Sequence, residues 1–305
     1  MNTLRSRLRG IYYALTSEAV PLHRGESVYP FFVVGSGRCG TTLLRRILQA
    51  SREIHIPPEN WILGKVIRRF HQHNWLLSWE QTVETVVAAH EYRTHWFDAA
   101  ASQVMREAQN WKREQRSLQR LLDRLYCFHG ENEGAVFDRW GDKTPMNINH
   151  MEAILKVFPQ AQFVHMLRDG VDVIHSWLEH GLYKEDIKNA AHRWKQAVAI
   201  SQGFGNKHPD RIIEVRYEEL CQNPEKVVRD LCNFLSIQYE DDLLSRSDHH
   251  DEMRKAQSVE HFQNAFKSIT TDSIGKGRKA LTGEQKRKVA PIIKAKVIRL
   301  GYDPL

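Results

Sequence analysis

The chain has 305 residues, 41% of them hydrophobic, and a formal net charge of +7. This length supports one large domain or two smaller ones, and the positive charge favours an anionic ligand without choosing between nucleotide, nucleic acid and membrane. No run approaches the ~20 apolar residues that span a bilayer, and residues 1–29 lack the apolar core of a signal peptide, so we expect a cytoplasmic protein without a transmembrane segment.

Cysteine and histidine usage argues against a disulfide framework and against a metal site. The 4 cysteines contain no Cys-x-x-Cys pair, which is typical of a reducing compartment and not of a disulfide framework. The 16 histidines include His71, His73 and a pair at 249–250, but these lack a nearby set of ligands at helical spacing. No metal site is therefore predicted.

Residues 1–29 predict an N-terminal helical extension. Arginines at positions 5, 7 and 9 stand beside apolar residues in this segment. It either packs as a short helix on the body of the protein, which we favour, or lies on an anionic membrane surface.

The stretch from Phe31 to Leu44 predicts a strand, a glycine-rich loop and a helix, because four apolar residues precede the loop and apolar residues recur after it at helical spacing. Gly35, Gly37 and Gly40 allow positive φ angles and a close approach of the backbone to a ligand. The first N–H groups of the helix would point at an anion. We interpret the loop as a phosphate site; the alternative is a tight βα connection without a ligand.

The spacing from Gly35 to Gly40 equals that of the nucleotide P-loop, but Thr41 stands where that motif has its lysine. The fixed cation of the loop is instead Arg38. Such a loop holds phosphate through amides and hydroxyls, yet lacks the point charge that contacts the β- and γ-phosphates of a nucleoside triphosphate. A magnesium-dependent P-loop kinase or nucleotidase is therefore the second interpretation.

A short extended stretch at 54–56 is followed by two prolines, and Glu59 then stands near the start of a helix. Glu59 is either a general base that faces the acceptor substrate or an acid that complements the helix dipole. Residues 62–130 read mostly as helix, contain no proline and are rich in tryptophan and histidine. We expect a helical insertion that covers the acceptor site, with most of its aromatic residues in packing roles.

Two later strands end in basic residues. A strand from Val136 ends at Lys143, and a strand at 163–167 is followed by Arg168, with Ser176 on the second turn of the next helix. Ligands bind at the carboxyl ends of strands in open α/β sheets, so the lysine can reach a phosphate or a leaving oxygen. Arg168 and Ser176 can clamp a second phosphate group, and the alternative for Arg168 is a local ion pair.

The remaining pattern alternates a helix at 184–203, a strand at 211–217 and a helix from 224 on. Such alternation predicts an α/β, P-loop-like three-layer fold with a central parallel sheet flanked by helices. Residues 241–281 are polar and basic, and 273–279 read as a mobile loop that can close over a charged nucleotide.

Several of these stretches together resemble the sulfotransferases that use 3′-phosphoadenosine-5′-phosphosulfate, in particular the bacterial branch and the related tyrosylprotein sulfotransferases. The matching stretches stand in the family's order between residues 31 and 281. They are Gly35 to Leu44, Pro58-Glu59, Asp142 to Pro145, Leu167 to Gly170 with Ser176, Val215 to Leu220, and Ser273 to Leu281.

The resemblance implies a single sulfotransferase domain over residues 1–305 and assigns roles to its motif residues. The 5′-phosphosulfate would be held by Arg38, Cys39, Gly40, Thr41 and Thr42. The 3′-phosphate would be held by Arg168 and Ser176, with Tyr217 near the nucleotide and with Ser273 and Arg278 in the mobile loop. Glu59 would be the catalytic base, and Lys143 would lie beside the transferred group. Cys39 replaces the family's usual serine, and Lys279 replaces a frequent tryptophan.

This chemistry suits the residues, because a sulfuryl transfer needs a base, in-line geometry and cations on the departing oxygen. Glu59 would take the proton from a hydroxyl or amine, while Arg38 and Lys143 would neutralise the leaving phosphate. No metal is expected, since no acid stands out as a magnesium ligand. The acceptor, whether lipid, carbohydrate, peptide or small alcohol, is left open. A third interpretation is a non-catalytic basic nucleic-acid-binding protein, but the sequence has no dedicated motif for that role, so no nucleic-acid partner is expected.

Overall fold

The computed structural model describes residues 19–94, 101–183, 186–247 and 269–305. The chain divides into two compact units. The first unit comprises residues 1–31 and 55–161, and the second comprises residues 32–54 and 162–305. Each unit is described by itself below.

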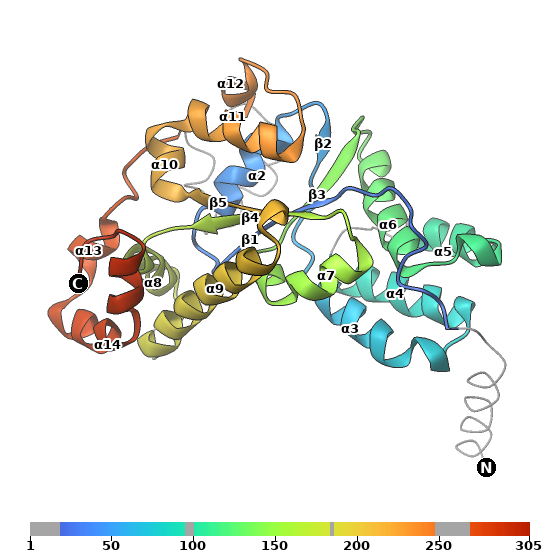
Figure 1. The fold of residues 1–305 in the computed structure, drawn as a ribbon, viewed down its shortest axis with the longest axis horizontal. Coiled ribbons are helices and arrows are strands. Elements are labelled where there is room, and N and C mark those ends of the chain that lie inside the picture. The colour runs from blue at the N-terminus through green and yellow to red at the C-terminus, as the bar shows by residue number, and fades with distance from the viewer. Residues whose placement is uncertain (1–18, 95–100, 184–185, 248–268) are drawn as a thin grey trace, which may run out of the picture. The chain divides into compact units, whose positions relative to one another are not determined.

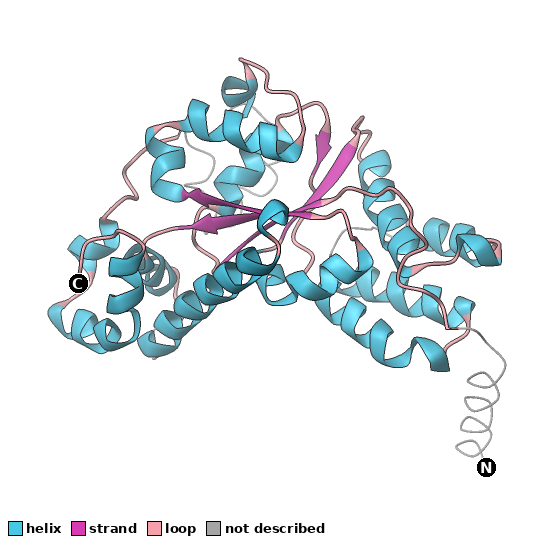
Figure 2. Ribbon diagram, viewed as in Figure 1, coloured by secondary structure: helices cyan, strands magenta, loops and turns pink. Residues whose placement is uncertain are grey.

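The strands are β1 (Phe31–Gly35), β2 (Ile54–His55), β3 (Arg139–Lys143), β4 (Gln162–Leu167) and β5 (Ile212–Arg216). They form a 5-stranded sheet in the order β2-β3-β1-β4-β5. Strands β4 and β5 run parallel, with Phe163 opposite Ile212 and Leu167 opposite Arg216. The predicted α/β fold with a parallel sheet and flanking helices is confirmed (Figure 2).

The helices of the second unit are α2 (Thr41–Gln49), α8 (Gly170–Glu179), α9 (Ile187–Lys207), η4 (Pro209–Arg211), α10 (Tyr217–Gln222), α11 (Pro224–Leu235), α12 (Leu243–Ser247), α13 (Lys276–Ala280) and α14 (Gly283–Arg299). Helices α10 and α11 lie on one side of β5, and α9 lies on the other (Figure 1). Phe163 of β4 packs between Phe32 of β1 and Phe204 of α9, with ring centroids 5.5 and 5.0 Å away. The apolar β1 segment is thereby buried, as its sequence predicts.

The helices of the first unit are α3 (Leu63–His73), η1 (Asn74–Leu76), α4 (Trp79–Thr94), α5 (Ala101–Gln109), η2 (Arg113–Gln115), α6 (Leu118–Asn132), η3 (Pro145–His150) and α7 (Met151–Val157). Trp79 and Trp111 are both buried and stack with ring centroids 5.8 Å apart. The indole N–H of Trp79 donates to the carbonyl oxygen of Ala108 at 2.6 Å. These two tryptophans hold helices together, as expected of most aromatics in this stretch.

Three local expectations differ from the structure. Val136 is 91% exposed and β3 begins only at Arg139, so the predicted strand start is wrong. Residues 19–29 contain no helix, and the rest of the predicted N-terminal extension lies outside the described residues. Of the predicted mobile loop, residues 248–268 also lie outside the described residues, whereas Lys276–Ala280 forms a helix.

A buried carboxylate explains that helix. Asp172 of α8 accepts hydrogen bonds from the backbone N–H groups of Gly275 at 2.7 Å and Gly277 at 2.8 Å. A Cβ on Gly277 would lie 2.4 Å from the carbonyl oxygen of Val171, so only glycine permits this close packing. Asp172 and these two glycines are more than 100 residues apart in the chain, so no local sequence pattern could predict their hydrogen bonds.

Candidate active site

The loop between β1 and α2 has the backbone of an anion cradle. Gly37, Arg38 and Gly40 have φ angles of 86°, 55° and 97°. A Cβ on Gly35 would lie 2.6 Å from the Sγ atom of Cys39, and a Cβ on Gly40 would lie 2.4 Å from Cδ2 of Tyr217. Close contacts therefore require glycine at positions 35 and 40, and the positive φ of Gly40 adds a conformational reason at that position.

Helix α2 begins directly after this loop, and no side chain caps it. Its first intrahelical bond runs from the N–H of Leu44 to the carbonyl oxygen of Gly40, so the amides of residues 41–43 have no acceptor within the helix. Cys39 is fully buried, and this burial raises the pKa of its thiol. Of the predicted residues Cys39 to Thr42, Thr41 and Thr42 thus present backbone N–H groups at a helix N-terminus, a geometry that suits phosphate or sulfate.

Arg38 and Ser176 were both predicted as ligands, and the structure brings them together. The Nε atom of Arg38 donates to the Oγ atom of Ser176 at 3.2 Å, and its NH2 atom lies 2.9 Å from Nε2 of His180. Sequence reading missed His180. The available signal was its position four residues after Ser176, which places both side chains on one face of α8 and its C-cap.

Arg168 is a buried cation of the second unit, only 8% exposed. Its guanidinium donates to the carbonyl oxygens of Arg38 at 3.2 Å and Ser273 at 2.5 Å. It also lies 4.5 Å from the ring centroid of Tyr217. Burial raises the pKa of Tyr217 to about 12, so its hydroxyl stays neutral at physiological pH. Arg168 therefore contacts three other predicted residues, Arg38, Tyr217 and Ser273.

Arg278 is held differently from the other predicted ligands. Its Nε atom donates to Oδ2 of Asp169 at 2.7 Å, and its terminal nitrogens donate to the carbonyl oxygens of Asp303 and Pro304 at 2.6 and 3.1 Å. These bonds attach α13 to the start of α8 and to the C-terminal residues. In this arrangement Arg278 fixes the segment that contains Ser273.

The first unit contains the other two predicted residues, Glu59 and Lys143, as an ion pair. The Nζ atom of Lys143 donates to Oε1 of Glu59. The lysine side chain is 3% exposed and that of Glu59 is 19% exposed, so the carboxylate has access to solvent while its partner has almost none. Lys143 is the last residue of β3, as the strand-end argument predicts.

A buried network of hydrogen bonds surrounds this pair. The Tyr126 hydroxyl donates to Oδ2 of Asp142 at 2.6 Å and accepts from the Asn60 amide at 3.0 Å. The Asn147 amide donates to Oδ1 of Asp142 at 2.9 Å, and the Asn60 backbone N–H donates to the hydroxyl of Thr144 at 2.7 Å. The network thus ties the residues next to Glu59 to those next to Lys143.

Asp142 is the titratable centre of that network. Its complete burial raises the pKa of its carboxyl to about 6, and the nearby charge of Glu59 acts in the same direction. Sequence reading missed Asn60, Tyr126 and Asn147 as supports of the site. For Tyr126 no signal was available, since it stands in a long helix 66 residues from Asn60.

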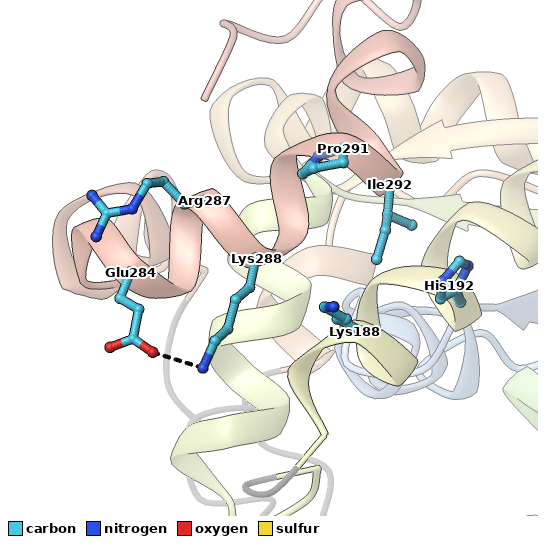
Figure 3. Close-up of a pocket in the computed structure, with 7 residues that line it drawn as sticks. All are labelled: Lys188, His192, Glu284, Arg287, Lys288, Pro291 and Ile292. Carbon is cyan, nitrogen blue, oxygen red and sulfur yellow. Dashed lines mark ion pairs between the residues drawn. The ribbon is translucent and has the colours of Figure 1, made fainter.

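Other residues of the described part of the chain line two cavities. One, of about 810 Å³, lies in the first unit between α3 and α4. The other, of about 470 Å³, lies in the second unit between α9 and α14, where Lys188 and His192 face a stripe that contains the Glu284–Lys288 ion pair (Figure 3). None of the predicted site residues lines either cavity.

Within residues 19–94, 101–183, 186–247 and 269–305, no group of three His, Cys, Asp or Glu residues is arranged to hold a metal ion. No helix in these ranges is long and apolar enough to cross a membrane.

A model of the sulfotransferase family matches residues 30–241 of the chain. The chain is similar to protein-tyrosine sulfotransferase 1 of Danio rerio, with 24% identity over 285 residues that cover 90% of this chain and 72% of that protein. It is also similar to protein-tyrosine sulfotransferase A of Caenorhabditis elegans, with 23% identity over 314 residues that cover 94% of this chain and 73% of that protein.

Solved structures show the same fold. The sulfotransferase domain of the Synechococcus PCC 7002 olefin synthase matches with a TM-score of 0.63 and 19% identity, covering 93% of this chain and 98% of that domain. The sulfotransferase domain from the curacin biosynthetic pathway matches with a TM-score of 0.59 and 21% identity, covering 92% and 100%. At these identities the likeness establishes the fold alone.

Proposed function

Because this chain belongs to the sulfotransferase family, as its motifs predicted, we propose that it moves a sulfuryl group from 3′-phosphoadenosine-5′-phosphosulfate to a hydroxyl or amine acceptor. The observation that carries this proposal is the convergence of Arg38, Ser176 and Arg168 at the N-terminus of α2. Two cations, together with helix amides that have no acceptor within the helix, suit a ligand with two separate anionic groups.

The donor would be held from both of its charged ends. The amides of residues 40–42 and the guanidinium of Arg38 would bind the 5′-phosphosulfate. Arg168 and Ser176 would bind the 3′-phosphate, and the Tyr217 ring would pack near the nucleotide. Ser273 and Arg278 would contribute by holding the C-terminal segment against Arg168, which is consistent with the bond from Arg168 to the carbonyl oxygen of Ser273.

Glu59 would act as the general base for the acceptor. The hydroxyl oxygen bonds to sulfur while its proton passes to the carboxylate of Glu59, and the bond from sulfur to the phosphate oxygen breaks with its electron pair going to the phosphate. Arg38 and Lys143 would stabilise that developing charge. The Glu59–Lys143 ion pair supports this role, because it orients a part-exposed carboxylate beside a nearly buried ammonium group.

The proposal is tested by calorimetry of the full chain with 3′,5′-bisphosphoadenosine, ADP, and ATP with magnesium. We expect 3′,5′-bisphosphoadenosine to bind tightest, with no requirement for magnesium. Tighter binding of ATP with magnesium would favour a kinase or nucleotidase. If none of the three nucleotides binds, the loop is a βα connection without a nucleotide and the proposal is wrong.

A further inference from the structure

The cavity in the first unit is built from one stripe of each of two helices. On α3 and the residue before it, the lining includes Ile62, Val66 and Phe70, which recur at helical spacing. On α4, the lining includes Val86 and Ala89 from one stripe.

The size and lining of this cavity suit a small apolar ligand. Its volume of about 810 Å³ falls within the range of about 300–1,000 Å³ that small-molecule sites occupy. Ala88 and Ala89 are only partly buried, and their short side chains leave the space open from the side of α4. An aliphatic body placed there would gain about 25 cal/mol for each Å² that it removes from water.

The charged side chains that line the cavity are all positive. Lys65 and Arg69 are both exposed and stand one turn apart on α3, and the lining contains no carboxylate. In the part of the chain that the structure describes, neither of these two cations forms an ion pair. Their aliphatic stems can cover an apolar body while their charged ends stay at the rim. This arrangement complements an acidic group attached to that body.

The cavity is also continuous along the chain with the proposed base. Trp61 lines the cavity, is 55% exposed and follows Glu59 by two residues. The segment between them is fixed, because the side-chain oxygen of Asn60 accepts from the N–H groups of Ile62 at 3.2 Å and Leu63 at 3.1 Å. A hydrogen-bonded turn therefore directly follows Glu59 and carries a wall of the cavity.

We infer that this cavity binds the acceptor, and that the acceptor is a small anionic amphiphile. Its apolar body lies between α3 and α4, its acidic group is held by Lys65 and Arg69, and it carries the hydroxyl whose proton Glu59 takes. This inference rests on the proposed function for the transfer step, in which the hydroxyl oxygen replaces the donor's phosphate oxygen on sulfur. The binding itself can be measured without any transfer.

The test is calorimetry of the full chain with two probes that share a ten-carbon chain, decanoate and decyltrimethylammonium. We expect decanoate to bind at least about tenfold more tightly, because two cations at the rim attract one head group and repel the other. In Lys65→Gln/Arg69→Gln this preference should disappear. The matched control is Arg68→Gln, which removes a charge from the same helix outside the lining and should leave decanoate affinity within about twofold.

The second part of the test uses substitutions that fill the cavity. Ala89→Trp, or Ala88→Phe where the first variant is poorly folded, should abolish decanoate binding, with 3′,5′-bisphosphoadenosine binding by the same preparation as the folding control. Undiminished decanoate binding in a folded filling variant would overturn the inference, and so would equal affinity for both probes.

The two proposals fail in distinguishable ways. A wild-type chain that binds 3′,5′-bisphosphoadenosine but neither probe refutes the acceptor cavity and leaves the proposed function standing. A peptide acceptor, or closure of the cavity by another segment of the chain, would give that result. Selective decanoate binding without any nucleotide binding supports the cavity and refutes the donor site.

Discussion

The two units hold their predicted functional groups by different means. In the second unit, Arg38 and Arg168 are arranged by backbone carbonyl oxygens, by a positive-φ loop and by one serine, so the site is made mostly of charge and main chain. In the first unit, the Glu59–Lys143 pair is supported by a buried network of neutral side chains around Asp142. In the proposed function, the second unit would bind the donor through groups that a short motif can specify. The first unit would orient the reacting carboxylate through packing, which a motif does not record.

The largest effect should come from removing the proposed base. Glu59→Gln keeps the shape of the side chain but cannot accept the proton, so turnover should fall by about 10²–10⁴-fold. Affinity for 3′,5′-bisphosphoadenosine should not change. Turnover is measured as donor-dependent sulfation of an acceptor, with Glu80→Gln on α4 as the matched control. Unchanged turnover would remove Glu59 from the mechanism.

Gly40→Ala tests the cradle in the second unit. The substitution places a Cβ 2.4 Å from the Tyr217 ring at a φ of +97°, so we expect a loss of about 2–4 kcal/mol in the free energy of unfolding and a large loss of nucleotide affinity. Gly301→Ala is the control, because Gly301 has a φ of +80° with nothing within 4 Å of the added Cβ. It should cost about 1–2 kcal/mol and leave nucleotide binding intact. Equal effects of the two substitutions would show that the contact with Tyr217 is unimportant.

The raised pKa of Asp142 predicts that the free energy of unfolding depends on pH. Burial raises the pKa of this carboxyl to about 6, so between pH 4 and pH 6 the folded protein holds a proton that the unfolded chain has released. Its contribution should therefore lower the free energy of unfolding as pH rises through this window, by about 2–3 kcal/mol in total. Urea denaturation from pH 4 to pH 7 should show this fall in the wild type, and a flatter profile in Asp142→Asn. Parallel profiles would contradict the assignment.

A smaller effect is expected at Tyr126. Tyr126→Phe removes the hydroxyl between Asn60 and Asp142, which leaves both groups short of a partner and should cost about 1–2 kcal/mol of unfolding free energy. Turnover should fall modestly while nucleotide affinity stays constant, because in the proposed function the network would position Glu59 and none of its members would bind the donor. Tyr29→Phe, at a residue that is 54% exposed, should change neither quantity.

The sequence predicted the second unit's site more completely than the first unit's. The glycine spacing and the basic strand ends identified Arg38 and Arg168, because local backbone geometry and strand polarity are encoded by short patterns. Asp172 was missed because its partners stand more than 100 residues away, and these bonds turn an expected loop into α13. Tyr126 was missed because nothing in an amphipathic helix marks which buried tyrosine has a polar partner. Contacts between distant segments are decided by packing, which no local pattern contains.

The most direct test of the account is the thermodynamic cycle formed by two nucleotides and Arg168→Ala. AMP and 3′,5′-bisphosphoadenosine differ only in the 3′-phosphate, so the cycle isolates the interaction between that phosphate and Arg168. The account predicts that the substitution lowers the affinity for 3′,5′-bisphosphoadenosine by about 100-fold and the affinity for AMP by less than about threefold. Equal weakening of the two nucleotides would show that Arg168 does not bind the 3′-phosphate, and would contradict the proposed donor site.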